Sequence, residues 1–242
     1  MQRYFIDSKQ ILNNIVTITN SDVHHIKNVM RMKVNDEVIV CDNLANTYLS
    51  KLISIEKDKV LLEIIDKINE NNELPIDITI AHGVVRREKT EEVIRRITEL
   101  GCYEYLPVLM KRSVVKVYQD RSERQNKIIK EASEQSHRNR LMILSSVISF
   151  QELINRKDEF DLCLYAHFNK NVKSIKKIIE NFHGRKILVA VGPEGGFADE
   201  EVLKLDEAGF IPITLGKRVL RTETAPLYVI SVFGYEFESF ID

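Results

Sequence analysis

The pattern of apolar residues changes at one polar stretch, KINENNELP, which spans residues 67–75 and ends in proline. Before it, short runs rich in β-branched residues alternate with turn signals, which is typical of a small β-barrel or sandwich. After it, strand-like runs alternate with helical patterns, which predicts an α/β domain with a largely parallel sheet. We therefore expect two domains, residues 1–72 and residues 73–242, with the boundary near residues 69–75.

Each predicted domain has its own series of elements. In the first, a short helix is expected over residues 21–31, where Ser21 or Asp22 can cap the first turn. The strand-like runs of this domain are 3–6, 15–19, 36–42, 47–56 and 59–66. The strand-like runs of the second are 76–83, 104–110, 141–147, 161–168, 186–192 and 210–215, and its helical patterns cover 88–101, 121–137, 171–182, 198–209 and 224–237.

Charge is balanced over the chain but not along it. The formal net charge is −1, yet residues 75–150 carry 14 basic and 10 acidic side chains. Such a local excess suits an RNA held by one surface, and a solvated helical face explains it equally well.

Several classes of protein are disfavoured by the sequence. The N-terminal residues lack the basic-then-apolar order of a signal peptide, and no apolar run approaches the roughly 20 residues that span a bilayer, so we expect a cytoplasmic protein. Cys41, Cys102 and Cys163 form no CxxC pair, which indicates neither a disulfide framework nor a zinc site. His24 and His25 are adjacent and no ligand cluster accompanies them, so no metal is expected.

A glycine-rich loop, VGPEGGFADEE, follows the strand-like run at residues 186–192. It matches neither common phosphate-binding fingerprint, and its acidic residues would repel a phosphate at the start of the next helix. Glycines that let the backbone approach a ligand, in acidic surroundings, suit a neutral or cationic ligand that contains an adenosine or a sulfonium. A plain strand-to-helix turn is the alternative that this loop alone favours.

A second loop, LGKRVLRTETA, begins at Leu215 and shifts the interpretation from a plain turn towards ligand binding. Together the two loops resemble the C-terminal signature of the SPOUT superfamily, the trefoil-knotted methyltransferases. The segments RYF, HHIKNVMRMKVNDEV, TELGCYEYLPVLMKRSVVK and EASEQSHRNR are similar, in order and spacing, to the bacterial 16S ribosomal RNA methyltransferases that modify N3 of a uridine. The resemblance covers nearly the whole chain.

The resemblance implies a small PUA-like β-barrel followed by an α/β trefoil-knot domain. It also implies a homodimer, S-adenosylmethionine as cofactor, and 16S ribosomal RNA in the small ribosomal subunit as substrate. Carried onto this chain, the cofactor-binding residues are Leu164, Tyr165, Ala166, Val191, Gly192, Pro193, Gly196, Leu215, Gly216, Val219, Leu220 and Arg221.

The implied chemistry requires N3 of uracil to lose its proton. A base or cationic groups that stabilise the uracil anion must therefore stand near it. Our hypothesis is that Arg221 and Arg138 pair with the uracil oxygens and that Glu223 is the base. The alternative is that Glu223 is a partner of the helix dipole in the first turn of the last helix, and the residues favour that simpler role.

The RNA-facing residues are expected among basic side chains of both domains, since phosphate contacts position a substrate and a flipped base supplies specificity. The set is Arg3, His25, Arg31, Arg86, Arg87, Lys89, Arg112, Lys116, Arg138 and Arg140.

Two other functions remain open from the sequence. A catalytically silent RNA-binding protein would need no pair of glycine-containing loops, and a knotted enzyme that methylates a ribose 2′-oxygen or a guanine would share them. In the last helix, an apolar face suits either burial against its own sheet or a dimer interface. This face carries Tyr228, Val229, Val232, Phe233, Phe237 and Phe240.

Overall fold

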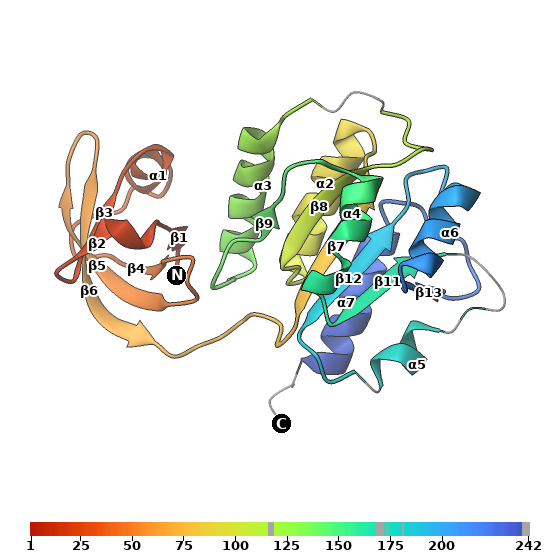
Figure 1. Cartoon of the computed structure of the whole chain (residues 1–242). Coiled ribbons are helices and arrows are strands. Elements are labelled where there is room, and N and C mark those ends of the chain that lie inside the picture. The colour runs from red at the N-terminus through yellow and green to blue at the C-terminus, as the bar shows by residue number, and fades with distance from the viewer. Residues whose placement is uncertain (116–118, 168–171, 173, 181, 239–242) are drawn as a thin grey trace. The chain divides into compact units, whose positions relative to one another are not determined.

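The computed structural model describes residues 1–115, 119–167, 172, 174–180 and 182–238. Its chain divides into two compact units (Figure 1). Unit 1 combines Met1–Glu73 with Ser133–Leu141, and unit 2 combines Leu74–Ala132 with Met142–Asp242. A single boundary in the sequence does not separate the two units, because residues 133–141 of unit 1 come after the first part of unit 2.

Unit 1 is built on a six-stranded sheet with the order β1-β4-β5-β6-β3-β2. β1 runs parallel to β4, and the other neighbours are antiparallel. Val38, Leu52 and Leu62 are fully buried and form the centre of a hydrophobic cluster with Tyr4 and Ile26. The strands are β1 (Arg3–Phe5), β2 (Ile11–Leu12), β3 (Ile15–Ile18), β4 (Glu37–Cys41), β5 (Thr47–Ile55) and β6 (Val60–Ile68).

The helical segment of unit 1 begins at Ser21, as predicted, but it differs from its prediction in its cap and its end. It consists of α1 (Ser21–His24), which continues into a π-helical turn, η2 (His25–Val29). The residue that precedes α1 is Asn20, with a left-handed φ of 63°, and it makes no side-chain capping bond. Neither Ser21 nor Asp22 is therefore the cap, because both already lie inside the first turn. A short 3-10 helix, η1 (Ser8–Gln10), has no counterpart in the prediction.

Unit 2 contains a parallel sheet whose strand order is β10-β8-β7-β12-β11-β13, with β9 paired to β8. Every residue of β7 is buried, as expected for a central strand covered on both faces. The strands are β7 (Asp77–Gly83), β8 (Glu104–Leu109), β9 (Ile143–Leu144), β10 (Ile148–Ser149), β11 (Leu162–Ala166), β12 (Lys186–Val191) and β13 (Ile211–Ile213).

The helices of unit 2 follow the predicted alternation with two differences. They are α2 (Arg87–Glu99), α3 (Ser122–Gln135, whose last residues belong to unit 1), α4 (Phe150–Asn155), η3 (Lys157–Glu159), α5 (Ile175–Ile179), α6 (Asp199–Glu207) and α7 (Ala225–Phe237). α5 is shorter than the predicted 171–182. α4 was not predicted, although Ser149 and Glu152 form a capping box at its start.

Candidate active site

Four neighbouring strands of unit 2 end at one edge of the sheet. His82 of β7 pairs in register with Val191 of β12, Val191 pairs with Ala166 of β11, and Ala166 pairs with Ile213 of β13. In open parallel sheets, ligands bind just outside the carboxyl ends of the strands. The loops that follow these four residues therefore meet where such a sheet offers a binding site.

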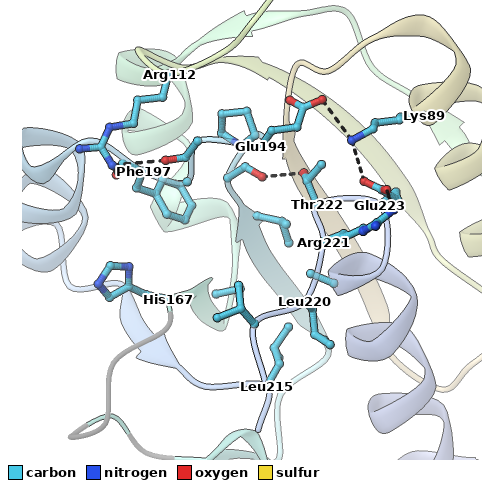
Figure 2. A pocket seen from close by; sticks show the side chains of 18 of the residues that line it. Lys89, Arg112, His167, Glu194, Phe197, Leu215, Leu220, Arg221, Thr222 and Glu223 are labelled. Carbon is cyan, nitrogen blue, oxygen red and sulfur yellow. Dashed lines mark hydrogen bonds and ion pairs between the residues drawn. The ribbon is translucent and has the colours of Figure 1, made fainter. Parts of the chain in front are cut away.

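A cavity of about 670 Å³ lies at this edge (Figure 2). Pockets that hold small molecules measure roughly 300–1,000 Å³. Residues of the loops 192–197 and 214–221 form most of the wall, and Lys89 and Arg112 add cationic side chains. The remaining lining residues are Ala166, His167, Val191, Thr222, Glu223 and Ala225.

The cavity brings together most of the residues predicted to bind the cofactor. These are Ala166, Val191, Gly192, Pro193, Gly196, Leu215, Val219, Leu220 and Arg221. Leu164 and Tyr165 do not line it, because both are buried inside β11. Gly216 lies between lining residues and has a left-handed φ of 115°.

Two glycines allow the first loop to fold close to its neighbours. A Cβ atom on Gly83, the last residue of β7, would lie 2.5 Å from Cδ of Pro193. A Cβ atom on Gly192 would lie 3.0 Å from the backbone of Gly196. A side chain at Gly83 would push the first loop away from β7, and one at Gly192 would force the turn of that loop to open by a few tenths of an ångström.

One ammonium group joins the two loops at the cavity. Lys89 Nζ lies 3.3 Å from Glu194 Oε1 in the first loop and 3.1 Å from Glu223 Oε2 beyond the second loop. Arg221 Nη1 lies 3.9 Å from the other oxygen of Glu223, and its side chain is 84% exposed. Figure 2 shows Lys89 between the two carboxylates. The Glu223 carboxylate is therefore flanked by two cations.

These neighbours decide the charge of Glu223. Partial burial works to raise its pKa, but a backbone hydrogen bond and the charges of Lys89 and Arg221 outweigh burial and hold the pKa below its ordinary value. Glu223 is consequently ionised at neutral pH. Of the predicted catalytic residues, Arg221 and Glu223 are thus brought together at the cavity.

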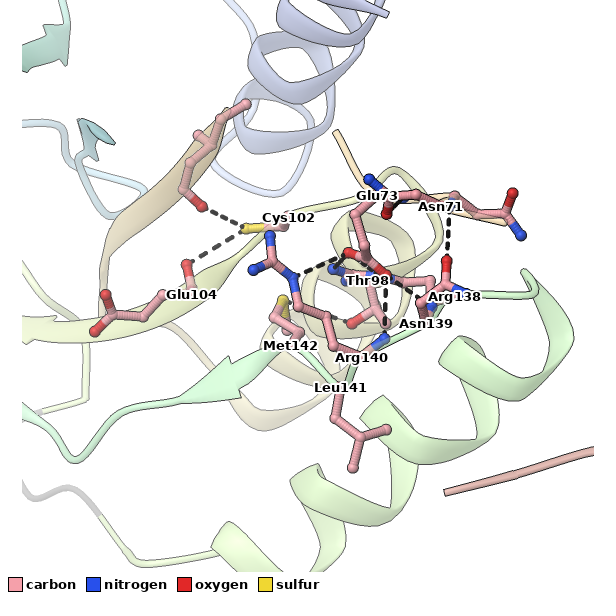
Figure 3. A network of polar contacts seen from close by, with 12 residues as sticks. Asn71, Glu73, Thr98, Cys102, Glu104, Arg138, Asn139, Arg140, Leu141 and Met142 are labelled. Carbon is pink, nitrogen blue, oxygen red and sulfur yellow. Dashed lines mark hydrogen bonds and ion pairs between the residues drawn. The ribbon is translucent and has the colours of Figure 1, made fainter. Parts of the chain in front are cut away.

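Arg138, the third predicted catalytic residue, lies in unit 1 and does not line the cavity. Its side chain is 2% exposed, and its Nη2 donates to Glu73 Oε2 at 2.5 Å. Glu73 Oε1 also accepts from the backbone amides of Asn139 and Arg140, at 2.8 and 3.2 Å (Figure 3). A contact between Arg138 and a substrate would require this buried ion pair to open, so the structure gives Arg138 a role in holding residues 133–141 within unit 1.

Glu73 stays charged despite its burial. Burial raises the pKa of this carboxyl, but the hydrogen bonds and charge of Arg138, with contributions from Asn139 and Arg140, outweigh burial and leave the pKa lowered. Arg3 completes the arrangement, because its Nη1 donates to the carbonyl oxygen of Arg138 at 2.7 Å.

The predicted RNA-facing residues fall into two groups. Arg31, Arg86, Arg87 and Arg112 are exposed. The second group is buried or partly buried and has internal partners. Arg3, Arg138 and Arg140 lie in the network around Glu73. His25 Nδ1 is 3.1 Å from Tyr4 Oη, and Lys89 pairs with two carboxylates. Lys116 lies outside the described residues.

Sequence reasoning missed the polar residues behind the cavity. His82, Tyr105 and Thr222 are buried there and are joined by hydrogen bonds. The available signal was weak: His82 is a polar residue near the end of the otherwise apolar run ITIAHG.

Among the residues that the structure describes, no helix is both long enough and apolar enough to cross a membrane. The same residues contain no group of three or more His, Cys, Asp or Glu side chains placed to hold a metal ion.

Comparisons with known proteins agree with this architecture. Residues 72–234 match the family described as an RNA methyltransferase domain, and residues 18–65 match an RNA methyltransferase PUA domain. The chain is 41% identical to ribosomal RNA small subunit methyltransferase E of Bacillus subtilis, over 98% of each chain. It is 30% identical to the protein of that name from Mesomycoplasma hyopneumoniae, over 96% of this chain and 98% of the relative.

A solved structure gives the same result for the fold. The ribosomal RNA small subunit methyltransferase E of Neisseria gonorrhoeae, bound to S-adenosylmethionine, superposes with a TM-score of 0.89 at 28% identity, over 98% of each chain.

The fold and the cavity define an RNA methyltransferase in which a PUA-like domain precedes an α/β domain of the SPOUT type, as the sequence resemblance implied. Within that class, the chain belongs to the ribosomal RNA small subunit methyltransferase E family. This membership favours an enzyme over the catalytically silent RNA-binding protein.

Proposed function

We propose that this chain transfers a methyl group from S-adenosylmethionine to N3 of a specific uridine in 16S ribosomal RNA, within the small ribosomal subunit. The observation that carries the proposal is the cavity at the carboxyl ends of β7, β12, β11 and β13, walled by both predicted loops. This cavity lies in the segment that matches the RNA methyltransferase domain.

The lining of the cavity fits a cofactor that contains an adenosine and carries charges of both signs. It holds the carboxylates of Glu194 and Glu223 together with the cationic side chains of Lys89, Arg112, Arg218 and Arg221. Apolar side chains of Leu215, Val219 and Leu220 offer contacts to an adenine ring, and the backbone of the glycine-containing loops can approach the ligand closely. When bound, S-adenosylmethionine supplies an activated methyl group.

The cluster around Glu223 suits the edge of a uracil. N3–H of uracil is a donor between two carbonyl acceptors, so its partner must place an acceptor between two donors. Glu223 is such an acceptor, with Lys89 beside one carboxylate oxygen and Arg221 beside the other. We assign the second cationic role to Lys89 in place of Arg138, whose guanidinium is bound to Glu73.

The proton step follows from these charges. Glu223 accepts the N3 proton, and Lys89 and Arg221 donate to the uracil oxygens and stabilise the anion that forms. The lowered pKa of Glu223 makes it a modest base. The two cations offset this, because they also lower the pKa of N3 when its oxygens are bound.

The remaining partners are inferred from the same family. RNA phosphates contact the exposed set Arg31, Arg86, Arg87 and Arg112, and the protein works in the cytoplasm, where ribosomal subunits are found. Two copies form a homodimer through α7, which exposes Tyr228 and Tyr235 one above the other on one helical face.

The test is mass spectrometry of nucleosides from small ribosomal subunits that lack the modification, after incubation with the protein and S-adenosylmethionine. We expect 3-methyluridine from the unaltered protein and none from Arg221→Ala, whose exposed side chain contributes little to folding. Arg96→Ala is the control, since Arg96 is an exposed arginine paired with Glu99 and does not line the cavity.

Other outcomes separate the alternatives. A methylated ribose or guanine would keep the enzyme class and replace the target. Absence of any new methylated nucleoside, from subunits and from free RNA alike, would contradict the proposed reaction. Full activity of Arg221→Ala would remove this residue from the mechanism.

A further inference from the structure

A chain of three hydrogen bonds runs from the wall of the cavity into the core of unit 2, and two of its residues, His82 and Tyr105, have no part in the proposed reaction. His82 of β7 has no exposed surface, and its Nε2 lies 2.8 Å from Oγ1 of Thr222. Its Nδ1 lies 3.0 Å from the hydroxyl of Tyr105 on β8. Thr222 in turn donates its hydroxyl proton to the carbonyl oxygen of Gly192, at 2.7 Å (Figure 2).

The direction of each bond follows from the chemistry of the groups. A carbonyl oxygen can only accept, so the single hydroxyl proton of Thr222 is used on Gly192. The contact between Thr222 and His82 then needs a proton on Nε2 of the imidazole. A neutral imidazole with Nε2–H has an unprotonated Nδ1, which accepts the hydroxyl proton of Tyr105.

The neutral state of His82 is favoured by its surroundings. Burial lowers its pKa to about 4, and the charge of Lys89 on α2 acts in the same direction. The hydrogen bond with Thr222 and the charges of Glu194 in the first loop and Glu223 just beyond the second act to raise the pKa, and burial outweighs them. One tautomer, and with it one pattern of donors and acceptors, is therefore kept at neutral pH.

The chain of bonds ties together the two loops that wall the cavity. Gly192 begins the loop after β12, and Thr222 follows directly on Arg221 at the end of the second loop. Thr222 is bonded to His82, which belongs to a strand at the centre of the sheet, and Gly192 is linked to His82 through Thr222. The next residue, Gly83, has no side chain, and Pro193 of the first loop lies directly against it. The carboxyl end of β7 thus contacts the first loop through Gly83 and the end of the second through His82.

We propose that His82 is a positioning residue: its Nε2–H holds Thr222, Thr222 holds Gly192, and this fixes the spacing of the two loops that bind S-adenosylmethionine. The inference rests on the proposed cofactor. It assigns to His82 no contact with the cofactor and no part in proton transfer.

The experiment uses two amide substitutions that differ by one methylene group and therefore in where they place their donor. In His82→Gln, the side-chain amide nitrogen can replace Nε2 as donor to Thr222. In His82→Asn, the shorter side chain reaches only the position of Nδ1, so the donor to Thr222 is lost. Isothermal titration calorimetry gives the Kd of S-adenosylmethionine for each full-length variant, and thermal unfolding gives its stability.

We expect the His82→Gln protein to bind the cofactor within about threefold of the unaltered protein, and His82→Asn to bind at least about tenfold more weakly, which corresponds to one lost hydrogen bond. Thr222→Val should match His82→Asn, and Thr222→Ser should bind normally because it keeps the hydroxyl. The double variant His82→Asn/Thr222→Val should be no weaker than either single variant, since both break the same chain of bonds.

A second measurement needs no cofactor. Amide hydrogen exchange in the loops 192–197 and 215–221 should be faster in His82→Asn than in His82→Gln, while the rest of unit 2 exchanges alike in the two proteins. If His82 only stabilised the core, both variants would unfold at a lower temperature and the two loops would exchange equally fast in both.

The outcomes are distinguishable. If the unaltered protein binds S-adenosylmethionine and His82→Asn and Thr222→Val bind it equally well, this inference is overturned and the proposed function stands. If His82→Gln and His82→Asn are folded and equally weak, the donor to Thr222 is not what matters and the inference is again overturned. If the unaltered protein binds no S-adenosylmethionine, the proposed function falls and this inference falls with it.

Discussion

Burial lowers the pKa of His82 to about 4, against an ordinary value of 6.5. Between these values the unfolded chain takes up a proton that the folded chain does not, so the free energy of unfolding falls as the pH falls. Between pH 7 and pH 5 the loss attributable to His82 is about 2 kcal/mol. Urea unfolding at these two pH values should show a loss larger by about this amount in the unaltered protein than in His82→Gln, which lacks the titrating group.

An equal loss in both proteins would contradict this assignment. It would mean that other groups carry the pH dependence in this window. The lowered pKa values of Glu73 and Glu223 act in a different window, because stability linked to a carboxylate with a lowered pKa is lost only as the pH falls below its ordinary value of 4.5.

The residues of the site differ in how far the sequence could reveal them. Gly192 and Arg221 stand in loops whose order of residue types is itself informative, so sequence alone could bring both to one site, and both line the cavity. The bond between His82 and Thr222 joins positions 140 residues apart. No local pattern reports such a contact, since it depends on which strands become neighbours in the sheet. The burial of Arg138 was missed for the same reason, because its partner Glu73 is 65 residues away.

At the scale of elements, one buried carboxylate contributes to holding the segment 133–141 within unit 1. Removing Glu73 would break its buried pair with Arg138, and breaking a buried pair in this way costs roughly 3–5 kcal/mol. We expect Glu73→Ala to lower the free energy of unfolding by about that amount in urea titrations. Proteolysis within residues 133–141 should become faster in the same variant.

Glu56→Ala is the matched control for this prediction. Glu56 also lies in unit 1 and pairs with Lys59 at 3.5 Å, but its side chain is 48% exposed. An exposed pair of this kind contributes about 0–1 kcal/mol. Similar losses in both variants would show that the Arg138–Glu73 pair has no special weight.

Elements with a strong period were predictable, and some short ones were not. The strand Asp77–Gly83 and the helix Ala225–Phe237 lie almost where their apolar patterns indicated. α4 is only 6 residues long and lies between the predicted runs 141–147 and 161–168, so the capping signal at Ser149 was needed to find it. β9 has 2 residues and lies inside the predicted run 141–147, whereas β10, also of 2 residues, was not predicted; both pair with β8.

At the scale of the whole molecule, the proposed homodimer makes a prediction about α7. Tyr235 is 78% exposed and Tyr228 is 37% exposed, and the two are separated by two helical turns. A charge introduced into an interface would lose its hydration without gaining a partner. Tyr235→Glu should therefore shift the sedimenting species from twice the mass of the 28.1 kDa chain towards that of one chain.

Leu203→Glu is the control, because Leu203 is a comparably exposed apolar residue (62%) on α6. It should leave the sedimenting mass unchanged. An unaltered protein that sediments as a single chain and methylates RNA at the same dilution would refute the dimer.

The division of unit 1 into two pieces also affects the order in which the protein can fold as it is made. Synthesis starts at the N-terminus, and at about 5–20 residues per second roughly 3 to 14 seconds separate the appearance of Glu73 from that of Leu141. During that interval the buried carboxylate of Glu73 has no arginine, and Phe5 and Ile39 lack the Leu141 side chain that packs on their cluster. Unit 1 is therefore completed only after α2, β7 and β8 of unit 2 have been synthesised, and the two units cannot fold strictly one after the other.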